Sequence, residues 1–438
     1  MLGLVPVAAL LFVAGQFDAN GIVVAETRAG QAPRVPGLPS EATVLGVLAP
    51  TLDLQYLSRS LELHIDYSIR IFWRESDQDS NFVPVYLHTG SVRAASRLTR
   101  RFQLTGSAEV SEGAVDYSYL PILLGTTQAT LVTVPQFFLA TATAGAAFNA
   151  TATTTLEMTA NAVHRRPIGD PNAVPAGAGA VPPLSTGTAP APYVLPTFDS
   201  VSAVPSVVIR LSPISAMALS SLVLYQSMSP ISSIASNGST LTFTESLTGL
   251  NVVPRIGWRG HPSRNSELGL SAGVAYSRLE RSDTGTTTTI DPVAAAAFSG
   301  LLVAERDFVL KTTLGTSVDS YLDPVLGSSG LRGTIAGGVR LALPSSWTLA
   351  IEGNFATAFE AHPQTIASAT VYPDETSAAL SIPIRHRVSD NVIAELGGRW
   401  SNRGRQIFAP EFSFHQRELW IYLLLTATSR RVPPWGTF

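Results

Sequence analysis

The sequence predicts an all-β chain that forms a transmembrane antiparallel up-and-down β-barrel of about 18 strands, within a range of roughly 14–18. Two observations predict this fold class. Only 14% of the 438 residues are charged, whereas 45% are apolar and the mean hydropathy is +0.22. A soluble protein carries about 25% charged residues. After the N-terminus there is no run of about 18 apolar residues, the length that a membrane-spanning helix needs, so alternating segments carry the hydrophobicity.

The segment Leu61–Arg74 shows this alternation most clearly. Apolar side chains occupy the odd positions from Leu61 to Trp73, and the even positions are mostly charged or polar. Successive side chains of a strand point to opposite faces, so this strand has one apolar and one polar face. Its length exceeds the usual five or six residues of a soluble strand. We expect the apolar face to meet lipid and the polar face to line a wet lumen.

The same alternation recurs along the chain, at residues 102–111, 268–276, 308–317, 347–355 and 419–426. In the last of these both faces are apolar, so its lumen face is weakly assigned. Nine short turns are predicted between paired strands, at Leu57–Ser60, Leu98–Arg101, Asn149–Ala152, Ser212–Ile214, Gly260–Asn265, Glu305–Asp307, Leu343–Ser346, Arg387–Asp390 and His415–Arg417. Long irregular connections are predicted at 113–135, at 167–200, which is rich in Pro, Gly and Ala, and at 228–246.

The two ends of the chain are expected to lie outside the barrel. Leu2–Val13 is typical of the apolar core of a signal peptide, and Ala14 and Gly15 offer a cleavage point, although no Lys or Arg precedes the core. The predicted layout is a signal peptide or N-terminal segment at 1–30, a short periplasmic linker at 31–44, the barrel at 45–430 and a tail at 431–438. The terminal Phe438 is typical of the signal that the barrel-assembly machinery reads, but Pro433 and Pro434 depart from that pattern.

The predicted turns raise a question about which end of the barrel faces outward. Barrels of this class have short periplasmic turns and longer outer loops. The predicted turn His415–Arg417 would precede the last strand directly. If the C-terminus is periplasmic, that turn faces outside and the long connections face the periplasm. Either a strand is missing from the prediction, or the barrel has a large inner surface.

Composition and motifs exclude most chemistry. The net charge of −3 leaves no electrostatic footprint for nucleic acid, and the absence of cysteine removes disulfides, thiolate metal sites and a cysteine nucleophile. The seven histidines show no metal-ligand spacing, and no phosphate loop or nucleophile elbow occurs. We therefore expect no cofactor, no metal and no enzymatic activity. A membrane-embedded esterase needs only a Ser and a His close in space, and the sequence alone does not rule it out.

The candidate functional residues are the charged groups expected on the lumen faces of the strands. They are Glu62, His64, Asp66, Arg70, Arg74, Glu109, Lys311, Glu352 and Arg399. They have two interpretations: a polar track that orients a hydrated solute, or a solvated wall in which opposite charges on neighbouring strands stabilise each other. The tryptophans at 73, 258, 347, 400 and 435 are expected at the membrane interface rather than as a platform for sugars.

Two segments carry a resemblance to a known group of proteins. The opening LAPTLDLQYLSRSLELHIDYS, residues 48–68, resembles barrels encoded with exopolysaccharide-export systems. The pair LTRRFQLTGSAEVSEGAVDY, residues 98–117, is similar to outer-membrane barrels of myxobacteria and their relatives. The resemblance covers 45–430 in architecture and rests on short motifs.

The resemblance implies a barrel in the outer membrane of a Gram-negative bacterium that conducts a nascent polysaccharide. Its implied partners are outer-membrane lipid, the polysaccharide chain and a periplasmic export protein that lacks an outer-membrane span of its own. No catalytic residues carry over from it. The alternative is a general diffusion porin, or a structural barrel without a substrate. A porin should have a short charged loop folded inward. The segment 167–200, in which Asp170 is the one acid before a run rich in Pro and Ala, has few of the charges that such a loop needs.

Overall fold

The computed structural model describes most of the chain. The described residues are 16–33, 40–76, 84–114, 136–168, 197–229, 231–234, 240–244, 246–282, 285–305, 308–323, 328–359, 364–366, 369–371, 374–406 and 414–429. Strands account for nearly all of them, joined by short turns and one 3₁₀ turn at Pro344–Ser346. Within these ranges no helix is long and apolar enough to span a membrane.

Eighteen strands form a single sheet. The first nine are β1 (Gln16–Pro33), β2 (Ser40–Leu57), β3 (Leu61–Ser76), β4 (Val85–Arg97), β5 (Phe102–Ala114), β6 (Gln136–Asn149), β7 (Thr154–Pro167), β8 (Phe198–Ser212) and β9 (Ser215–Met228). The other nine are β12 (Leu247–Ser263), β13 (Ser266–Arg281), β14 (Gly285–Glu305), β15 (Phe308–Asp323), β16 (Ser328–Leu343), β17 (Trp347–Phe359), β20 (Asp374–Ser389), β21 (Val392–Gln406) and β22 (Phe414–Thr428).

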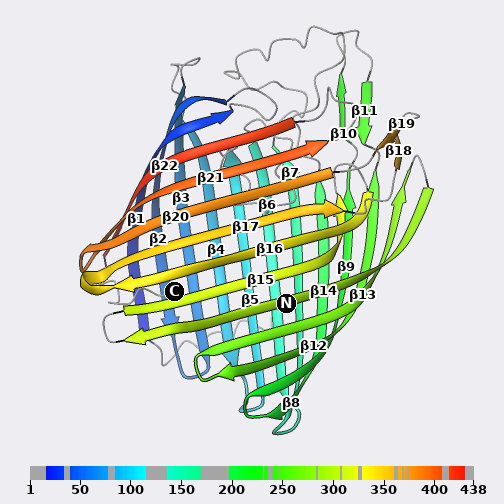
Figure 1. Cartoon of the computed structure of the whole chain (residues 1–438), viewed down its shortest axis with the longest axis horizontal. Helices are drawn as coiled ribbons and strands as arrows, with labels where there is room; N and C mark the ends of the chain where they lie inside the picture. Colours follow the sequence, from blue (N-terminus) through cyan, green and yellow to red (C-terminus); the bar gives the residue numbers. More distant parts are fainter. Residues whose placement is uncertain are drawn as a thin grey trace, which may run out of the picture.

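The sheet closes on itself. Each strand pairs antiparallel with the next strand of the sheet, and β22 pairs with β1 from Ile22↔Thr428 to Gln31↔Leu419. The last strand therefore lies beside the first, as the red and blue ribbons of Figure 1 show. Closure gives every strand of the sheet a partner on both sides, and lipid would penalise a strand left unpaired on one side. The predicted 18-stranded antiparallel barrel is confirmed.

Side chains alternate between the two faces of the wall, as the sequence of β3 predicted. On β3, Ile65 and Tyr67 are 39% and 46% exposed on the outward face, while Asp66 between them is half-buried on the inward face. On β22, where the sequence left the faces weakly assigned, Leu419, Ile421, Leu423 and Leu425 are exposed on the outward face. Trp420 and Tyr422 therefore point inward.

The predicted turn His415–Arg417 is wrong. Those residues lie inside β22, where Gln416 pairs with Arg403 and Arg417 with Asn402. Their polar sequence imitates a turn because this end of β22 extends beyond the apolar band. The other eight predicted turns coincide with strand connections. Gln16 pairs with Leu57, beside the β2–β3 turn, so β1 begins at the same end of the barrel as the tight turns, and β22 ends there. The conflict over sidedness therefore disappears.

The barrel starts earlier in the chain than 45. Residues 16–33 form β1 and β2 starts at Ser40, within the ranges expected to hold the N-terminal segment and the linker. The small residues Ala19, Gly21 and Ala25 on the outward face of β1 weaken its alternation. Cleavage after Gly15 would leave β1 intact, whereas removal of 1–30 would delete most of it. Residues 1–15 and the tail from 430 lie outside the described residues.

The predicted long connections fall at the other end of the barrel. Residues 115–135 and 169–196 lie outside the described residues, and β8 already begins at Phe198. In place of an irregular loop at 228–246 there is a small hairpin of β10 (Ile231–Ile234) and β11 (Thr240–Thr244). A second hairpin, β18 (Gln364–Ile366) and β19 (Ala369–Val371), lies between β17 and β20.

The face assignment of β3 can be tested with one substitution on each face. We expect Ile65→Arg to destabilise the barrel by about 2–4 kcal/mol if the residue lies near the bilayer midplane, because a guanidinium then faces hydrocarbon. The matched change Asp66→Asn keeps the acceptor for Ser91 Oγ and should cost less than about 1 kcal/mol. Urea titration of the barrel refolded in lipid vesicles measures both. Equal losses for the two variants would contradict the register.

Candidate functional site: the inner wall of the barrel

The structure places the nine candidate residues on inward faces of five strands. They lie on β3 (Glu62, His64, Asp66, Arg70 and Arg74), β5 (Glu109), β15 (Lys311), β17 (Glu352) and β21 (Arg399). In each strand the alternate positions carry the exposed apolar side chains, for example Val110, Leu314 and Ile351. The five residues of β3 form one row along the barrel, whereas Glu352 and Arg399 belong to a separate group.

The charges of β3 are tied to neighbouring side chains. His64 Nε2 lies 2.8 Å from Glu62 Oε1 and 3.3 Å from Gln55 Nε2 of β2. Ser91 Oγ of β4 donates to Asp66 Oδ2 at 2.9 Å. An Arg74 guanidinium nitrogen lies 3.9 Å from Glu41 Oε1. One of these contacts, Arg74 with Glu41 of β2, joins opposite charges across strands, as the second interpretation expects. The others bind the charges of β3 to polar neighbours.

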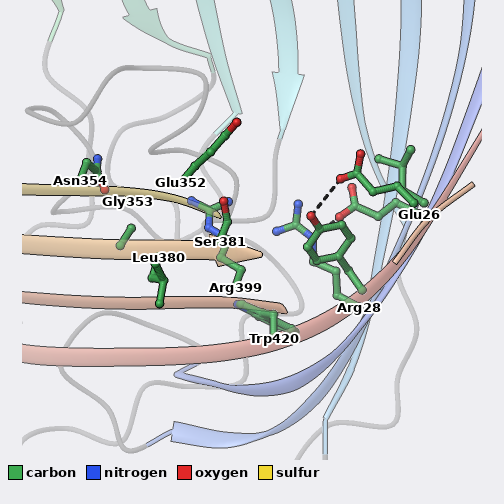
Figure 2. A pocket seen from close by; sticks show the side chains of 13 residues that line it. Glu26, Arg28, Glu352, Gly353, Asn354, Leu380, Ser381, Arg399 and Trp420 are labelled. Atoms are coloured by element: carbon green, nitrogen blue, oxygen red, sulfur yellow. Dashed lines mark hydrogen bonds and ion pairs between the residues drawn. The ribbon is translucent and has the colours of Figure 1, made fainter. Parts of the chain in front are cut away.

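A cavity of about 420 Å³ lies against the inner wall where the barrel closes. Residues of β17, β20, β21, β22 and β1 line it (Figure 2). Its lining includes Glu26, Arg28, Glu352, Glu395 and Arg399. Three carboxylates and two guanidinium groups line it, so hydrogen-bond donors and acceptors occur together. Carboxylates, guanidinium groups and a phenol in this arrangement can hydrogen-bond a hydroxyl-rich solute.

Glu395 is the hub of this group. Its Oε2 accepts from Arg385 Nε and Nη2 of β20 at 2.9 and 2.8 Å, and its Oε1 accepts from the Tyr422 hydroxyl at 2.9 Å. Glu395 is only 8% exposed. A fork of two N–H donors and a phenol satisfies a carboxylate that would otherwise be costly to desolvate. Glu26 and Arg28 of β1 form a further ion pair beside it.

Sequence analysis missed several members of this group. Glu26 and Arg28 fell in the range expected to be removed or irregular, and Tyr422 lies on a strand whose two faces are both apolar. Glu395 could have been predicted from the sequence, because it lies four residues before Arg399 and therefore on the same face of the strand. For Arg385 the signal was its alternation with the outward Ile382 and Ile384, which are exposed.

The inward face becomes apolar toward the end with the long connections. One buried cluster consists of Ala32, Leu45, Val47, Phe72, Leu87, Phe137, Leu139 and Trp420, and another of Phe198, Met228, Leu247 and Leu279. Phe72, Leu87 and Phe137 are at most 1% exposed. A wet lumen wall would leave them accessible, so these inward side chains pack on one another at this end of the wall. The alternation of these strands does not predict such packing.

The end of β15 leaves the wall and contacts its inner face. An Arg255 guanidinium on the inward face of β12 forms an ion pair with Asp319 near the end of β15. Ser320 Oγ lies 3.1 Å from Asn251 Nδ2 of β12 and 2.9 Å from Ser277 Oγ of β13. In the sheet β14 separates β15 from β13, so these contacts require the end of β15 to cross the inner face of the wall.

Four of the tryptophans predicted at the interface lie on the outward face. Trp258, Trp347 and Trp400 are 36%, 43% and 38% exposed, and Trp73 is half-buried. Trp258 Nε1 donates to Ser215 Oγ at 2.8 Å, and Trp347 stacks on His386 with ring centroids 4.2 Å apart, both close to tight turns. Aromatic rings with a polar partner at a barrel end are typical of an interfacial girdle. Trp435 lies outside the described residues.

The described part of the inner wall holds no candidate metal centre, since no three His, Asp or Glu side chains group there in a way that could bind an ion. The carboxylates of the cavity are engaged by arginines and a tyrosine. Nothing in their geometry presents an activated nucleophile.

Comparisons with known proteins support the fold alone. No protein-family model matches the chain, and no curated protein matches it. Among solved structures, the FrpB iron transporter from Neisseria meningitidis superposes with a TM-score of 0.50 at 8% identity, over 89% of this chain and 64% of the transporter. A bacterial polysaccharide outer membrane secretin covers 94% of this chain and 98% of its own at 11% identity, with a TM-score of 0.35. OccK2 (OpdF) of Pseudomonas aeruginosa, in complex with glucuronate, matches at 13% identity over 94% of this chain and 98% of its own, with a TM-score of 0.39.

The fold therefore defines the class of protein: a barrel of the outer-membrane type, with the architecture of channels and transporters. The structures compared include a transporter, a secretin and a solute-bound barrel, and their low identity does not single out one activity. The myxobacterial resemblance stays an expectation.

The pairing of luminal charges can be tested through ion selectivity. Arg340 Nη2 lies 3.0 Å from Glu352 Oε1. Glu352→Gln removes one negative charge from the inner wall and should therefore raise the anion-to-cation permeability ratio. Arg340→Gln should lower it. A change of about one RT in the free-energy difference between anion and cation in the lumen alters the ratio roughly two- to threefold, and the change is larger at low salt. Reversal potentials in planar bilayers measure this.

The control for that measurement is Glu112→Gln, which removes an exposed carboxylate from the outward face of β5. It should leave the ratio unchanged. Equal shifts from Glu112→Gln and Glu352→Gln would mean that Glu352 does not line the conducting path.

Proposed function

We propose that the chain is a channel in the outer membrane of a Gram-negative bacterium, and that it translocates a secreted exopolysaccharide. One observation carries the proposal: the polar inner wall is a mosaic of paired charges rather than a ring of one sign. The pairs Arg340–Glu352 and Arg385–Glu395 lie on adjacent strands, and Glu26–Arg28 lie on one strand.

Such a wall suits the passage of a hydroxylated polymer. Rings of one charge select ions, and tight sites hold a solute that must also leave. Paired carboxylates and guanidinium groups leave little net field, yet they still offer donors and acceptors that sugar hydroxyls can exchange in sequence. Successive sugar units of the polymer can therefore bind the wall weakly and leave it again as the chain moves through.

The proposed export partner docks at the end of the barrel that carries the tight turns. Short turns are periplasmic in barrels of this class, and both termini lie at the same end here. Arg59, Arg100, Arg101 and Arg264 are exposed in three of these turns, and none of them forms an ion pair with a described residue. A partner with an acidic face would match them. The long connections leave the barrel at the opposite end and are not part of this docking surface.

A general diffusion porin is the second candidate, and one observation favours it. The end of β15 folds inward and brings Asp319 against the inner wall, the kind of charged internal segment that a porin constriction needs. A constriction of this kind would sieve small solutes. The two functions make opposite predictions for a deletion.

Deletion of the gene should abolish one surface polysaccharide and leave small-solute uptake unchanged. Carbohydrate analysis of the cell surface and uptake of a labelled disaccharide measure the two effects. Normal surface polysaccharide together with impaired uptake would overturn the export proposal and favour the porin.

Complementation then tests the partner. The wild-type gene should restore the polysaccharide, whereas the double variant Arg100→Glu/Arg101→Glu should assemble as a heat-modifiable barrel without restoring it. The control Arg278→Glu places a reversed charge on the outward face of β13, near the opposite end. Restoration by all three would refute docking at the turns.

A further inference from the structure

The ladder between β14 and β15 stops early. Strand β14 begins at Gly285, but β15 pairs with it only from Ala294↔Val318 onward. Strands β15 and β16 stay paired with each other as far as Asp323↔Ser328. Two strand ends, residues 319–323 of β15 and 328–330 of β16, therefore lie beyond the end of the β14–β15 ladder while they remain joined; we call them the inner hairpin end. From Leu331 onward β16 stays paired with β17 in the wall.

Specific polar contacts hold the inner hairpin end against the wall. Asp319 pairs with Arg255, and Ser320 Oγ bonds both Asn251 and Ser277, which are 3% and 1% exposed. Three neighbouring polar groups thus converge on two adjacent residues. A chance approach of a loose loop would not bury them.

The part of the wall that the latch reaches is buried. The inward faces of β12, β13 and β14 carry the cluster of Val253, Ala275 and Val293, which are at most 3% exposed. Val253 lies between Asn251 and Arg255 on the inward face of β12, and Ala275 lies two residues from Ser277. The wall residues that bind Asp319 and Ser320 therefore belong to a region shielded from solvent.

The register of the β14–β15 ladder defines a second position for residues 319–323, in which they pair with β14. Continuing the β14–β15 ladder pairs Val293 with Asp319, then Pro292 with Ser320, and so on to Thr289 with Asp323. The backbone edge of β14 from Gly285 to Val293 has no partner from β15, and a sheet edge is a template for a strand. Pro292 has no N–H, so the ladder loses a donor close to the step at which it stops.

We propose that the inner hairpin end is a gate with two positions. In the closed position it lies inside the lumen, latched by Arg255 to Asp319 and by Ser277 and Asn251 to Ser320. In the open position it joins the wall by pairing with β14, and the lumen widens on the side of β12 and β13. The open position has backbone hydrogen bonds to β14, and the closed position has the side-chain bonds of the latch. Because each set replaces the other, a small change in the stability of either set shifts the population between the two positions.

The latch should respond to salt and to anions because its ion pair is partly exposed to solvent. The side chains of Arg255 and Asp319 are 24% and 38% exposed, so salt screens their attraction and solute anions compete for the guanidinium. High salt should therefore favour the open position.

The absence of cysteine allows each position to be locked. The double variant Ser277→Cys/Ser320→Cys locks the closed position, because the two hydroxyls are 2.9 Å apart. Val293→Cys/Asp319→Cys links residues that face each other only in the open position. The control Ser317→Cys/Thr334→Cys crosses the base of the hairpin, where the hydroxyls are 2.7 Å apart in either position.

Single-channel conductance of the purified full chain in planar bilayers, before and after reduction with dithiothreitol, is the readout. Oxidised Ser277→Cys/Ser320→Cys should show only a low level, oxidised Val293→Cys/Asp319→Cys a steady higher level, and the control both. The proposal is overturned if the Val293→Cys/Asp319→Cys disulfide does not form in the membrane, or if either lock leaves the conductance unchanged. Should a double variant fail to assemble, Asp319→Asn alone decides, since it must raise the fraction of time spent at the higher level.

Discussion

The hydrogen-bonded closure of β22 onto β1 is the interaction on which the rest of the structure depends. In hydrocarbon a backbone N–H or C=O has no water to bond, so a sheet can span it only when its two edges meet. The ladder from Ile22↔Thr428 to Gln31↔Leu419 achieves this. With an even number of strands, closure also puts both chain ends at one end of the barrel, the end of the tight turns.

Closure separates two environments, and the side chains follow. The outward face carries leucine, isoleucine and valine, while the inward face holds charges that would be costly in lipid. On the inward face, hydrogen bonds to neighbouring side chains stabilise these charges. Glu395 accepts from Arg385 and Tyr422, and Asp66 accepts from Ser91. The proposed path for a polymer and the proposed gate both use this polar inner surface. The gate adds a position where the wall itself is incomplete, between β14 and β15.

The sequence predicted those features that depend on one strand at a time. The alternation of Leu61–Arg74 predicted the two faces of β3, and eight of the nine predicted turns lie between strands. The number of strands agreed because two errors cancelled: the false turn His415–Arg417 added a strand, and β1 was missed. Prediction from the sequence failed where a pattern is weak or where partners are distant in sequence. The small outward residues of β1 concealed a strand, and the polar start of β22 imitated a turn. The cavity needs Glu26 from one end of the chain beside Tyr422 from the other, and only closure brings them together. The inward fold of Asp319 depends on Arg255 three strands away in the wall, which no local pattern encodes.

The central claim is that β22 is a wall strand that faces lipid with its odd positions and an aqueous lumen with its even ones. Single-cysteine variants at 421 to 426, spin-labelled in lipid vesicles, test it directly. Labels at 421, 423 and 425 should collide with oxygen dissolved in the bilayer, and labels at 422, 424 and 426 with a water-soluble nickel chelate, in strict alternation. Equal access to the chelate at all six positions would contradict the closed barrel and the lumen with it.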